Sequence, residues 1–401
     1  MLLKISVKNF KSIKEKVTLS MVPAKSNYLS NNIINTGINK EPRLLKTISL
    51  YGSNASGKTT VLEAFKYLKY IITETINFQE SDKLYYNPFK LSENTKNEPT
   101  EISVEFFHKG KLLNYEIKLN EDRILYENLL IDNKEIFERK EEFIPGIDHK
   151  KQKQIYEFTK KNIPYLSRAS NHNFKKAELA YEWFDKKLGP IIMTEFFERP
   201  MRKKDAIKNY KESDKEEILN LLKSADIKIK DIKKVTKEVK HPEKDETLEV
   251  KQIKTYHKND SKELVEFDLE KDESKGTSEL FSLVSLFLDA IKNSRILIID
   301  EFENSLHPFL QTFLINLFQD SSNSKSQLIF STHNVLFLDQ DLFRKDQIYF
   351  TDKEKGYTDL FSLNEFKDER HDRAYLKKYL IGKYGALPKT VSRFIMNEKT
   401  D

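Results

Sequence analysis

The chain has 401 residues, a net charge of +6, 38% hydrophobic residues and 33% charged residues. This length suits roughly two or three domains, and the mild positive charge permits contact with nucleic acid without requiring it. No apolar run approaches the roughly 20 residues of a membrane helix, and the first ten residues lack the apolar core of a secretory signal peptide. We therefore expect a cytoplasmic protein with no membrane partner. The absence of cysteine excludes disulfides, thiol nucleophiles and cysteine-ligated metal sites.

Residues 52–59 read GSNASGKT and fit the phosphate-binding pattern G-x-x-x-x-G-K-[ST]. The preceding LLKTISLY, residues 44–51, predicts a short strand, and residues 59–76 carry apolar side chains at helical spacing. A nucleotide loop needs this order of strand, loop and helix, because backbone amides at a helix N-terminus bind phosphates. The context therefore favours a nucleotide site over an ordinary glycine turn.

Each residue type in such a loop has a task. Glycine lets the backbone curl around the phosphates, Lys58 reaches the β- and γ-phosphates, and Thr59 holds Mg²⁺. We therefore expect ATP and Mg²⁺ as cofactors. The residues of this segment predicted to bind nucleotide are Gly52, Ser53, Asn54, Ala55, Ser56, Gly57, Lys58, Thr59 and Thr60.

The middle of the chain alternates between strand and helix patterns. Residues 101–130 predict a β-meander, because apolar alternation is interrupted by turn-like HKGK and LNED segments. From about residue 133 to 225 the pattern is helical, and Ser213 is the candidate N-cap of the helix in EEILNLLKSA. Residues 199–240 hold 14 Lys and Arg against 8 Asp and Glu, which favours a solvated helical face over a surface for nucleic acid or an acidic partner. Residues 232–270 predict a hairpin.

Residues 272–294 predict a strongly amphipathic helix. Ser274, Gly276 and Thr277 stand at its front, within the segment SKGTS. A serine–glycine turn that leads into a helix N-terminus is a second candidate anion site, because its amides and the helix dipole favour negative charge.

Residues 296–301 read ILIIDE, and four consecutive apolar residues predict a fully buried strand of a parallel sheet. Asp300 at the end of that strand is placed to hold Mg²⁺, and Glu301 to polarise an attacking water as general base. The alternative is a strand that merely ends in two solvated acids. The long separation between Thr59 and Asp300 implies a large insertion in the nucleotide-binding domain.

Two further segments follow this strand. FENSLHP occupies residues 302–308, and QLIFSTHN, residues 327–334, predicts another strand with His333 just past its end. An isolated histidine is usually a satisfied structural residue. Its position after a strand that follows the acidic motif favours a role in the site for His333.

The order of these motifs resembles an ABC-type ATPase head of the SMC, SbcC and RecF class. The opening LKISVKNFKSIKE, residues 3–15, is similar to the first strand and N-F-[KR]-S turn of those heads. More narrowly, ILIIDEFENSLHP and LIFSTHN, with RKDQIYF at 344–350 and YLIGKYGALP at 379–388, resemble the prokaryotic AbiL, RloA and AriA group of ATPases, which is linked to abortive infection and phage defence.

The resemblance implies a dimer in which two subunits enclose two ATP molecules. Ser274 and Gly276, with Thr277, would then contact the γ-phosphate bound by the other subunit, although ESKGTS departs from the common L-S-G-G-Q form. His333 would sense the γ-phosphate and, with Glu301 and Lys58, make up the catalytic set. Asn304 and Ser305 would form the loop that links the two sites.

The resemblance also implies an α/β fold, an ABC-type P-loop head with a mixed sheet, a flanking antiparallel sheet and an inserted, mainly helical lobe. The predicted domains are the N-terminal part of the head at 1–130, the helical lobe at 131–240, the C-terminal part of the head at 241–365 and a helical tail at 366–401.

Two carboxylate clusters suggest a nuclease as a weaker hypothesis. Asp339 and Asp341 have D-x-D spacing, which we interpret as a helix start, and Asp368, Glu369, His371 and Asp372 are interpreted as a solvated helical run. We expect an ATPase that is not itself a nuclease and acts as the sensor or switch subunit of an anti-phage system, controlling a separate effector encoded nearby. The alternative is a DNA-repair ATPase of the RecF or SMC kind that binds DNA.

Overall fold

The computed structural model describes residues 1–34, 41–140, 143–193, 210–240, 247–303, 307–320, 325–338, 341–353, 356–366 and 375–386. It contains two compact units. The first, here called the P-loop unit, comprises Met1–Ile191, Ser294–Phe302 and Phe318–Asp401, and the second, the inserted unit, comprises Ile192–Asn293 and Glu303–Leu317. The boundaries of these units differ from those of the predicted domains. The domain boundaries remain a prediction.

A six-stranded sheet forms the centre of the P-loop unit. Its strands β15, β16, β5 and β17 lie side by side and run parallel, and β18 closes one edge antiparallel to β17. The parallel strands are buried along almost their whole length, because helices or loops cover both faces of such a sheet. In sheet order the strands are β11 (Leu188–Ile192), β15 (Ile296–Ile299), β16 (Gln327–Ser331), β5 (Thr47–Tyr51), β17 (Ile348–Asp352) and β18 (Asp359–Ser362).

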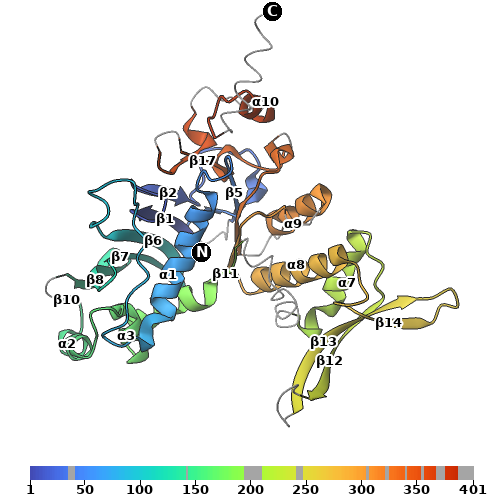
Figure 1. Ribbon diagram of the computed structural model, residues 1–401, viewed down its shortest axis with the longest axis horizontal. Coiled ribbons are helices and arrows are strands. Elements are labelled where there is room, and N and C mark those ends of the chain that lie inside the picture. Colours follow the sequence, from blue (N-terminus) through green and yellow to red (C-terminus); the bar gives the residue numbers. More distant parts are fainter. Residues whose placement is uncertain are drawn as a thin grey trace, which may run out of the picture. The chain divides into compact units, whose positions relative to one another are not determined.

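A seven-stranded antiparallel sheet lies in the same unit, beside helix α1 (Lys58–Thr73; Figure 1). Buried and solvated residues alternate along β7, as expected for a sheet with one face on the core. The predicted meander at 101–130 is confirmed by β6, β7 and β8. In sheet order the strands are β10 (Phe143–Pro145), β9 (Lys134–Arg139), β8 (Ile124–Ile131), β7 (Lys111–Leu119), β6 (Thr100–His108), β1 (Leu2–Lys8) and β2 (Val17–Ser20).

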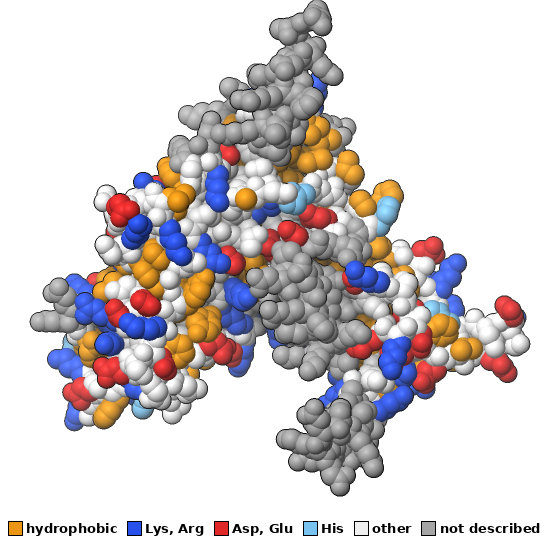
Figure 2. Space-filling model, viewed as in Figure 1, with side chains coloured by type: hydrophobic (Ala, Val, Ile, Leu, Met, Phe, Trp, Pro, Cys, Tyr) orange, Lys and Arg blue, Asp and Glu red, His pale blue; other side chains and the backbone are white. Residues whose placement is uncertain are grey.

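The solvated face of this sheet is polar and its charges are paired across strands. Lys4 Nζ lies 2.8 Å from Glu105, and Lys118 Nζ lies 2.8 Å from Glu101. Figure 2 shows acidic and basic side chains interspersed over this part of the molecule. Opposite charges on neighbouring strands stabilise the pairing modestly and leave no strong field of one sign.

The helical pattern predicted from residue 133 begins later than expected. Asp132 and Asn133 have φ values of 50° and 61°, which make a tight hairpin turn that continues the sheet into β9 and β10. Asp and Asn tolerate this left-handed backbone, so the turn overrides the helical composition. The helices follow as α2 (His149–Glu157), α3 (Tyr165–Asn171), α4 (Lys175–Glu182) and a π-helical turn (Trp183–Lys187).

The inserted unit combines helices with a three-stranded antiparallel sheet of β12 (Asp231–Lys240), β13 (Thr247–Lys258) and β14 (Leu264–Asp268). This sheet confirms the hairpin predicted at 232–270. Helices α7 (Lys215–Ser224) and α8 (Lys275–Lys292) pack against each other. The predicted N-cap at Ser213 is wrong: Ser213 lies in a 3-10 turn and bonds to Asp214, which takes the N-cap position.

The remaining elements are short, apart from α1 and α9. No helix in the described ranges is long and apolar enough to cross a membrane. The elements are β3 (Ile33–Ile34), β4 (Leu44–Leu45), α1 (Lys58–Thr73), α9 (Pro308–Asp320), α10 (Tyr375–Leu380) and the 3-10 turns Ser30–Asn32, Thr75–Asn77, Glu212–Asp214, Val335–Leu338, Lys345–Gln347 and Leu363–Glu365.

An aromatic cluster under the antiparallel sheet generates a stability prediction. Phe106 is fully buried and its ring stacks on Trp183 with centroids 4.1 Å apart. We expect Phe106→Ala to lower the free energy of unfolding by about 3–5 kcal/mol, because it removes buried area and leaves a cavity. Urea unfolding followed by the fluorescence of Trp183, the chain's one tryptophan, measures this. Phe158→Ala, at a side chain that is 70% exposed, is the control and should change little.

Candidate nucleotide-binding site

The candidate site forms where three neighbouring strands end. Strands β15, β16 and β5 are parallel and adjacent, so their carboxyl ends meet at one edge of the sheet. Asp300 follows β15 directly, Ser331 ends β16, and the loop 52–57 follows β5. In open α/β sheets this edge is where ligands bind. Segments far apart in sequence are therefore brought together by strand order alone.

The loop 52–57 requires glycine at both ends. Gly57 has a φ of 111°, and a Cβ there would lie 2.0 Å from Thr358 Oγ1. At Gly52 a Cβ would lie 2.5 Å from both Ser56 Oγ and Thr351 Oγ1. Neither position has room for a side chain, since these neighbours are themselves buried. The two glycines of the motif therefore serve close packing as well as backbone conformation.

Lys58 opens helix α1 and is buried. Its ammonium donates hydrogen bonds to the carbonyl oxygens of Gly52, at 2.9 Å, and Ser53, at 3.2 Å. The charge is thereby held across the loop, near the amides at the start of the helix. A cation beside a helix N-terminus is unfavourable unless an anion binds there, so this arrangement suits phosphate oxygens.

Asp300 joins the loop to the two neighbouring strand ends. Its carboxylate is fully buried and accepts hydrogen bonds from Thr59 Oγ1, at 2.9 Å, and from Ser331 Oγ, at 2.5 Å. Ser331 Oγ also accepts a hydrogen bond from the Glu301 amide at 2.8 Å. Glu301 has a φ of 49°, which is uncommon for a residue with a side chain and is often found at functional sites. Ser331 thus positions both acids.

A row of hydroxyl groups supports the loop from the other side. Ser12 Oγ lies 2.8 Å from Thr358 Oγ1 and donates to Thr60 Oγ1 at 3.0 Å. Thr358 Oγ1 donates to the Ser56 carbonyl at 3.0 Å, and Ser56 Oγ lies 2.6 Å from Thr351 Oγ1. Of these residues, Thr351 and Thr358 were not predicted, since no local motif marks them. The N-F-K-S turn that contains Ser12 was the one available signal.

The other predicted residues are placed as follows. His333 lies two positions past the end of β16, at the same edge, and is exposed. Ser274 is the N-cap of α8 in the inserted unit, where its Oγ accepts a hydrogen bond from the Thr277 amide at 3.1 Å. Gly276 has ample space around it, since a Cβ there would lie 4.0 Å from Ser274 Oγ, an ordinary contact. Residues Asn304, Ser305, Asp339, Asp368, Glu369, His371 and Asp372 lie outside the described residues.

The helix start predicted at the D-x-D segment is wrong for Asp341. This residue lies in a turn, and its carboxylate accepts a hydrogen bond from the Tyr28 hydroxyl at 2.7 Å. The partner comes from the N-terminal part of the chain, which a local pattern does not reveal.

The residues present fit a magnesium ion. Thr59 Oγ1 and an Asp300 oxygen, 2.9 Å apart, are the oxygen donors that Mg²⁺ prefers, and this ion usually takes few protein ligands alongside phosphate and water. Within the described ranges, no group of three or more His, Cys, Asp or Glu side chains could hold a metal ion.

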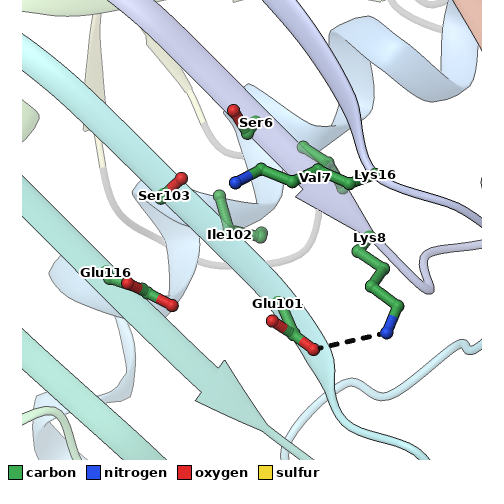
Figure 3. A pocket seen from close by; sticks show the side chains of 8 residues that line it. All are labelled: Ser6, Val7, Lys8, Lys16, Glu101, Ile102, Ser103 and Glu116. Atoms are coloured by element: carbon green, nitrogen blue, oxygen red, sulfur yellow. Dashed lines mark ion pairs between the residues drawn. The ribbon is translucent and has the colours of Figure 1, made fainter.

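Two hollows lie elsewhere on the P-loop unit. The one drawn in Figure 3, on the polar face of the antiparallel sheet, has a volume of about 30 Å³ and includes the Lys8–Glu101 ion pair at 3.7 Å. This is room for little more than a water molecule. The second has about 310 Å³ and lies along α1, lined by Phe10, Lys11, Glu63, Lys66, Tyr67, Tyr70 and Tyr85.

The second hollow has an aromatic wall. The rings of Phe10 and Tyr67 stack with centroids 5.1 Å apart, and the Tyr67 hydroxyl donates to the Tyr85 carbonyl. Burial raises the pKa of Tyr67 well above its ordinary value, so this hydroxyl keeps its proton. Tyr70 and Tyr85 are 36% and 48% exposed, and Lys11 is held 2.5 Å from Glu63.

A family model described as "AAA domain, putative AbiEii toxin, Type IV TA system" matches residues 48–339. This range contains the glycine loop, Asp300, Glu301 and His333. The chain belongs to this family. It is an AAA-type P-loop ATPase domain, and the predicted α/β fold with a mixed sheet and a flanking antiparallel sheet is confirmed. No curated protein matches the chain.

The chain is also similar to solved SMC head domains. The SmcHead bound to the C-winged helix domain of ScpA shares 11% identity, over 90% of this chain and 97% of that chain, with a TM-score of 0.41. The SMC head domain from Thermotoga maritima shares 14% identity over 90% and 98%, with a TM-score of 0.39. The Smc head domain with an extended coiled coil bound to the C-terminal domain of ScpA, derived from Pyrococcus furiosus, shares 13% over 90% and 96%, with a TM-score of 0.42.

The position of Ser331 leads to a kinetic prediction. We expect Ser331→Ala to lower kcat for ATP hydrolysis about 10-fold or more while ATP affinity stays within about twofold, because a hydrogen bond to a charged group contributes about 1.5–3 kcal/mol. Steady-state kinetics and equilibrium binding of ATP measure the two effects. Ser6→Ala, which removes a hydroxyl bonded to Thr18 in the antiparallel sheet, is the matched control. An unchanged kcat in Ser331→Ala would show that Ser331 does not position Glu301.

Proposed function

We propose that the chain binds and hydrolyses ATP as a dimer and acts as the sensor or switch subunit of an anti-phage defence system that controls a separate effector. The observation that carries the ATPase part is the hydrogen bond between Thr59 and Asp300, residues 241 positions apart. This hydrogen bond brings the phosphate-binding loop and a metal-binding carboxylate together at one edge of the sheet, with Glu301 next to them. That combination suits phosphoryl transfer to water.

Each residue has a defined task in this proposal. The loop amides and Lys58 bind the β- and γ-phosphates, and Thr59 with Asp300 would hold Mg²⁺, which supplies charge neutralisation on the phosphates. Glu301 accepts a proton from the attacking water as general base, and His333 contacts the γ-phosphate. Ser274, Gly276 and Thr277 complete the site of the second subunit, where the α8 N-terminus favours a phosphate.

Two observations support the defence role. The family description names a putative toxin and a toxin–antitoxin system. The motifs at residues 296–308 and 328–334 resemble the AbiL, RloA and AriA group. An ATPase that works with an effector needs a state that depends on bound ATP, and closure of a dimer around two nucleotides provides one. The effector is a second protein encoded nearby.

A DNA-binding ATPase is the second candidate, and the hollow along α1 favours it. Exposed Tyr70 and Tyr85 offer rings for stacking, and Lys66 supplies positive charge beside them, whereas Lys11 is paired with Glu63. Aromatic rings with neighbouring cations bind unpaired bases and their phosphates with little sequence preference. The hollow of about 310 Å³ is large enough for a base.

Two substitutions test the ATPase part. We expect Lys58→Ala to abolish ATP binding, because it removes the ammonium that pairs with the phosphates. Glu301→Gln should bind ATP, hydrolyse it at least about 100-fold more slowly, and accumulate as a dimer, because the base is lost and closure persists. ATP binding, phosphate release and native mass measure these results. Normal turnover in Glu301→Gln would remove the assignment of Glu301.

The same Glu301→Gln chain, purified from its native host with ATP and Mg²⁺, tests whether the chain binds a separate effector. We expect the native mass to include a second protein in stoichiometric amount, since a switch subunit holds its effector in one nucleotide state. Lys58→Ala, purified in parallel, is the control for nucleotide dependence. A bare dimer would contradict the defence role.

The second candidate has its own measurement. If the chain binds single-stranded DNA, Tyr70→Ala with Tyr85→Ala should weaken binding about 10- to 100-fold, since stacking contributes about 1–3 kcal/mol per base. Fluorescence anisotropy at two salt concentrations measures this. Phe158→Ala, another exposed aromatic, is the control. No binding by the unaltered chain would exclude this candidate.

A further inference from the structure

The turn that precedes α8 in the inserted unit is tightly built. It joins β14 to the helix, and the Asp268 carbonyl accepts hydrogen bonds from three consecutive amides, those of Lys271, Asp272 and Glu273, at 3.2, 2.9 and 3.3 Å. The Asp272 carboxylate accepts a bond from the Asp268 amide at 2.7 Å. The backbone from Asp268 to Glu273 therefore behaves as one compact segment.

The middle strand of the three-stranded sheet holds this segment through Glu273. Glu273 Oε1 accepts a hydrogen bond from Thr255 Oγ1 at 2.5 Å and lies 2.6 Å from His257 Nε2, both on β13. A carboxylate only accepts hydrogen bonds, so the His257 ring is the donor. The Glu273 side chain is 8% exposed, and the Phe267 ring of β14 packs against His257 with centroids 4.8 Å apart. The contact is thus partly buried and oriented.

A second set of contacts between β13 and the turn lies at Asp268. Lys254 Nζ lies 3.1 Å from the Asp268 carboxylate, and both side chains are almost completely buried. The Leu269 amide donates to the Ile253 carbonyl at 3.2 Å, and the Ser278 hydroxyl of α8 donates to the Leu269 carbonyl. The turn is therefore attached to β13 at both of its ends.

Ser274 comes directly after Glu273. Its φ and ψ of −62° and 150° are those of an N-cap, and its Oγ also lies 2.9 Å from Thr277 Oγ1. Helix α8 fixes Ser274 on the C-terminal side, since most of that helix is buried. Glu273 fixes it on the N-terminal side. A displacement of β13 would consequently move the Ser274 hydroxyl and the helix N-terminus.

We propose that Thr255, His257 and Glu273 are positioning residues for Ser274, so that the β12–β14 sheet sets whether the signature segment 274–277 can engage ATP. This inference rests on the proposed function, in which Ser274 contacts the nucleotide of the other subunit. A purely structural role for the Glu273 contacts would alter folding stability and leave the assembled site unaffected. The two roles therefore differ in kinetics.

The test uses the full chain with His257→Ala and, separately, Glu273→Ala. Because the P-loop residues are untouched, ATP affinity of the single chain should stay within about twofold. We expect kcat to fall about tenfold and ATP-driven dimerisation to weaken by a similar factor. His257→Gln, whose amide can still donate to Glu273, should recover most of both. Lys258→Ala, at the exposed next residue of β13, is the control and should match the unaltered chain.

The outcomes separate this inference from the proposed function. Folded variants that keep full kcat and dimerisation would overturn the inference, whether or not their melting temperature falls. If Glu273→Ala does not fold, His257→Ala as the loss variant and His257→Gln as the recovering variant carry the comparison. Ser274→Ala is measured in parallel. If it slows turnover while His257→Ala does not, only the inference fails, and if it has no effect, the signature assignment fails and the inference with it.

Discussion

The candidate site depends on the contact between Asp300 and the two hydroxyl groups of Thr59 and Ser331. A fully buried carboxylate is tolerated only when hydrogen bonds or a cation compensate for its lost hydration. Here the compensating groups come from a loop and from a neighbouring strand end, so the sheet cannot keep its order without bringing those segments together. The burial of Asp300 is thus at once a structural cost and the reason that phosphate-binding and acidic residues are adjacent.

The site is layered around this contact. Ser331 bonds to both Asp300 and the Glu301 amide, so the positions of these two residues are linked. The row of hydroxyl groups from Ser12 to Thr351 supports the opposite side of the loop. The glycine loop, Asp300, Glu301 and Ser331 all belong to the P-loop unit. The signature segment belongs to the inserted unit, which has its own sheet and its own supporting contacts. Under the proposed function, such a division would let nucleotide binding and nucleotide-dependent closure of the dimer be altered separately.

Some parts of this site could be predicted from the sequence because each is specified by a short continuous segment. The glycine loop, the apolar strand before Asp300 and the strand before His333 are each specified within about ten residues, and periodicity with motif spacing identifies them. Thr358 and Thr351 were missed because their task comes from strand order, which places β17 next to β5. The residues that follow Asn133 were wrongly assigned to a helical region. Their composition suggested a helix, but the left-handed backbone of Asp132 and Asn133 makes a hairpin turn instead.

The contact of Thr358 with the glycine loop has a consequence for how the protein is made. Ser12 and Thr358 are 346 positions apart, yet both pack on the loop, and Thr358 occupies the space that a side chain at Gly57 would need. The ribosome must therefore continue from the glycine loop as far as Thr358 before the wall of the loop is complete. Contacts of such long sequence separation form late and slowly. Nascent chains would carry the nucleotide motif without a finished pocket until Thr358 has been added and can pack on the loop, and ATP could stabilise the fold only after that point.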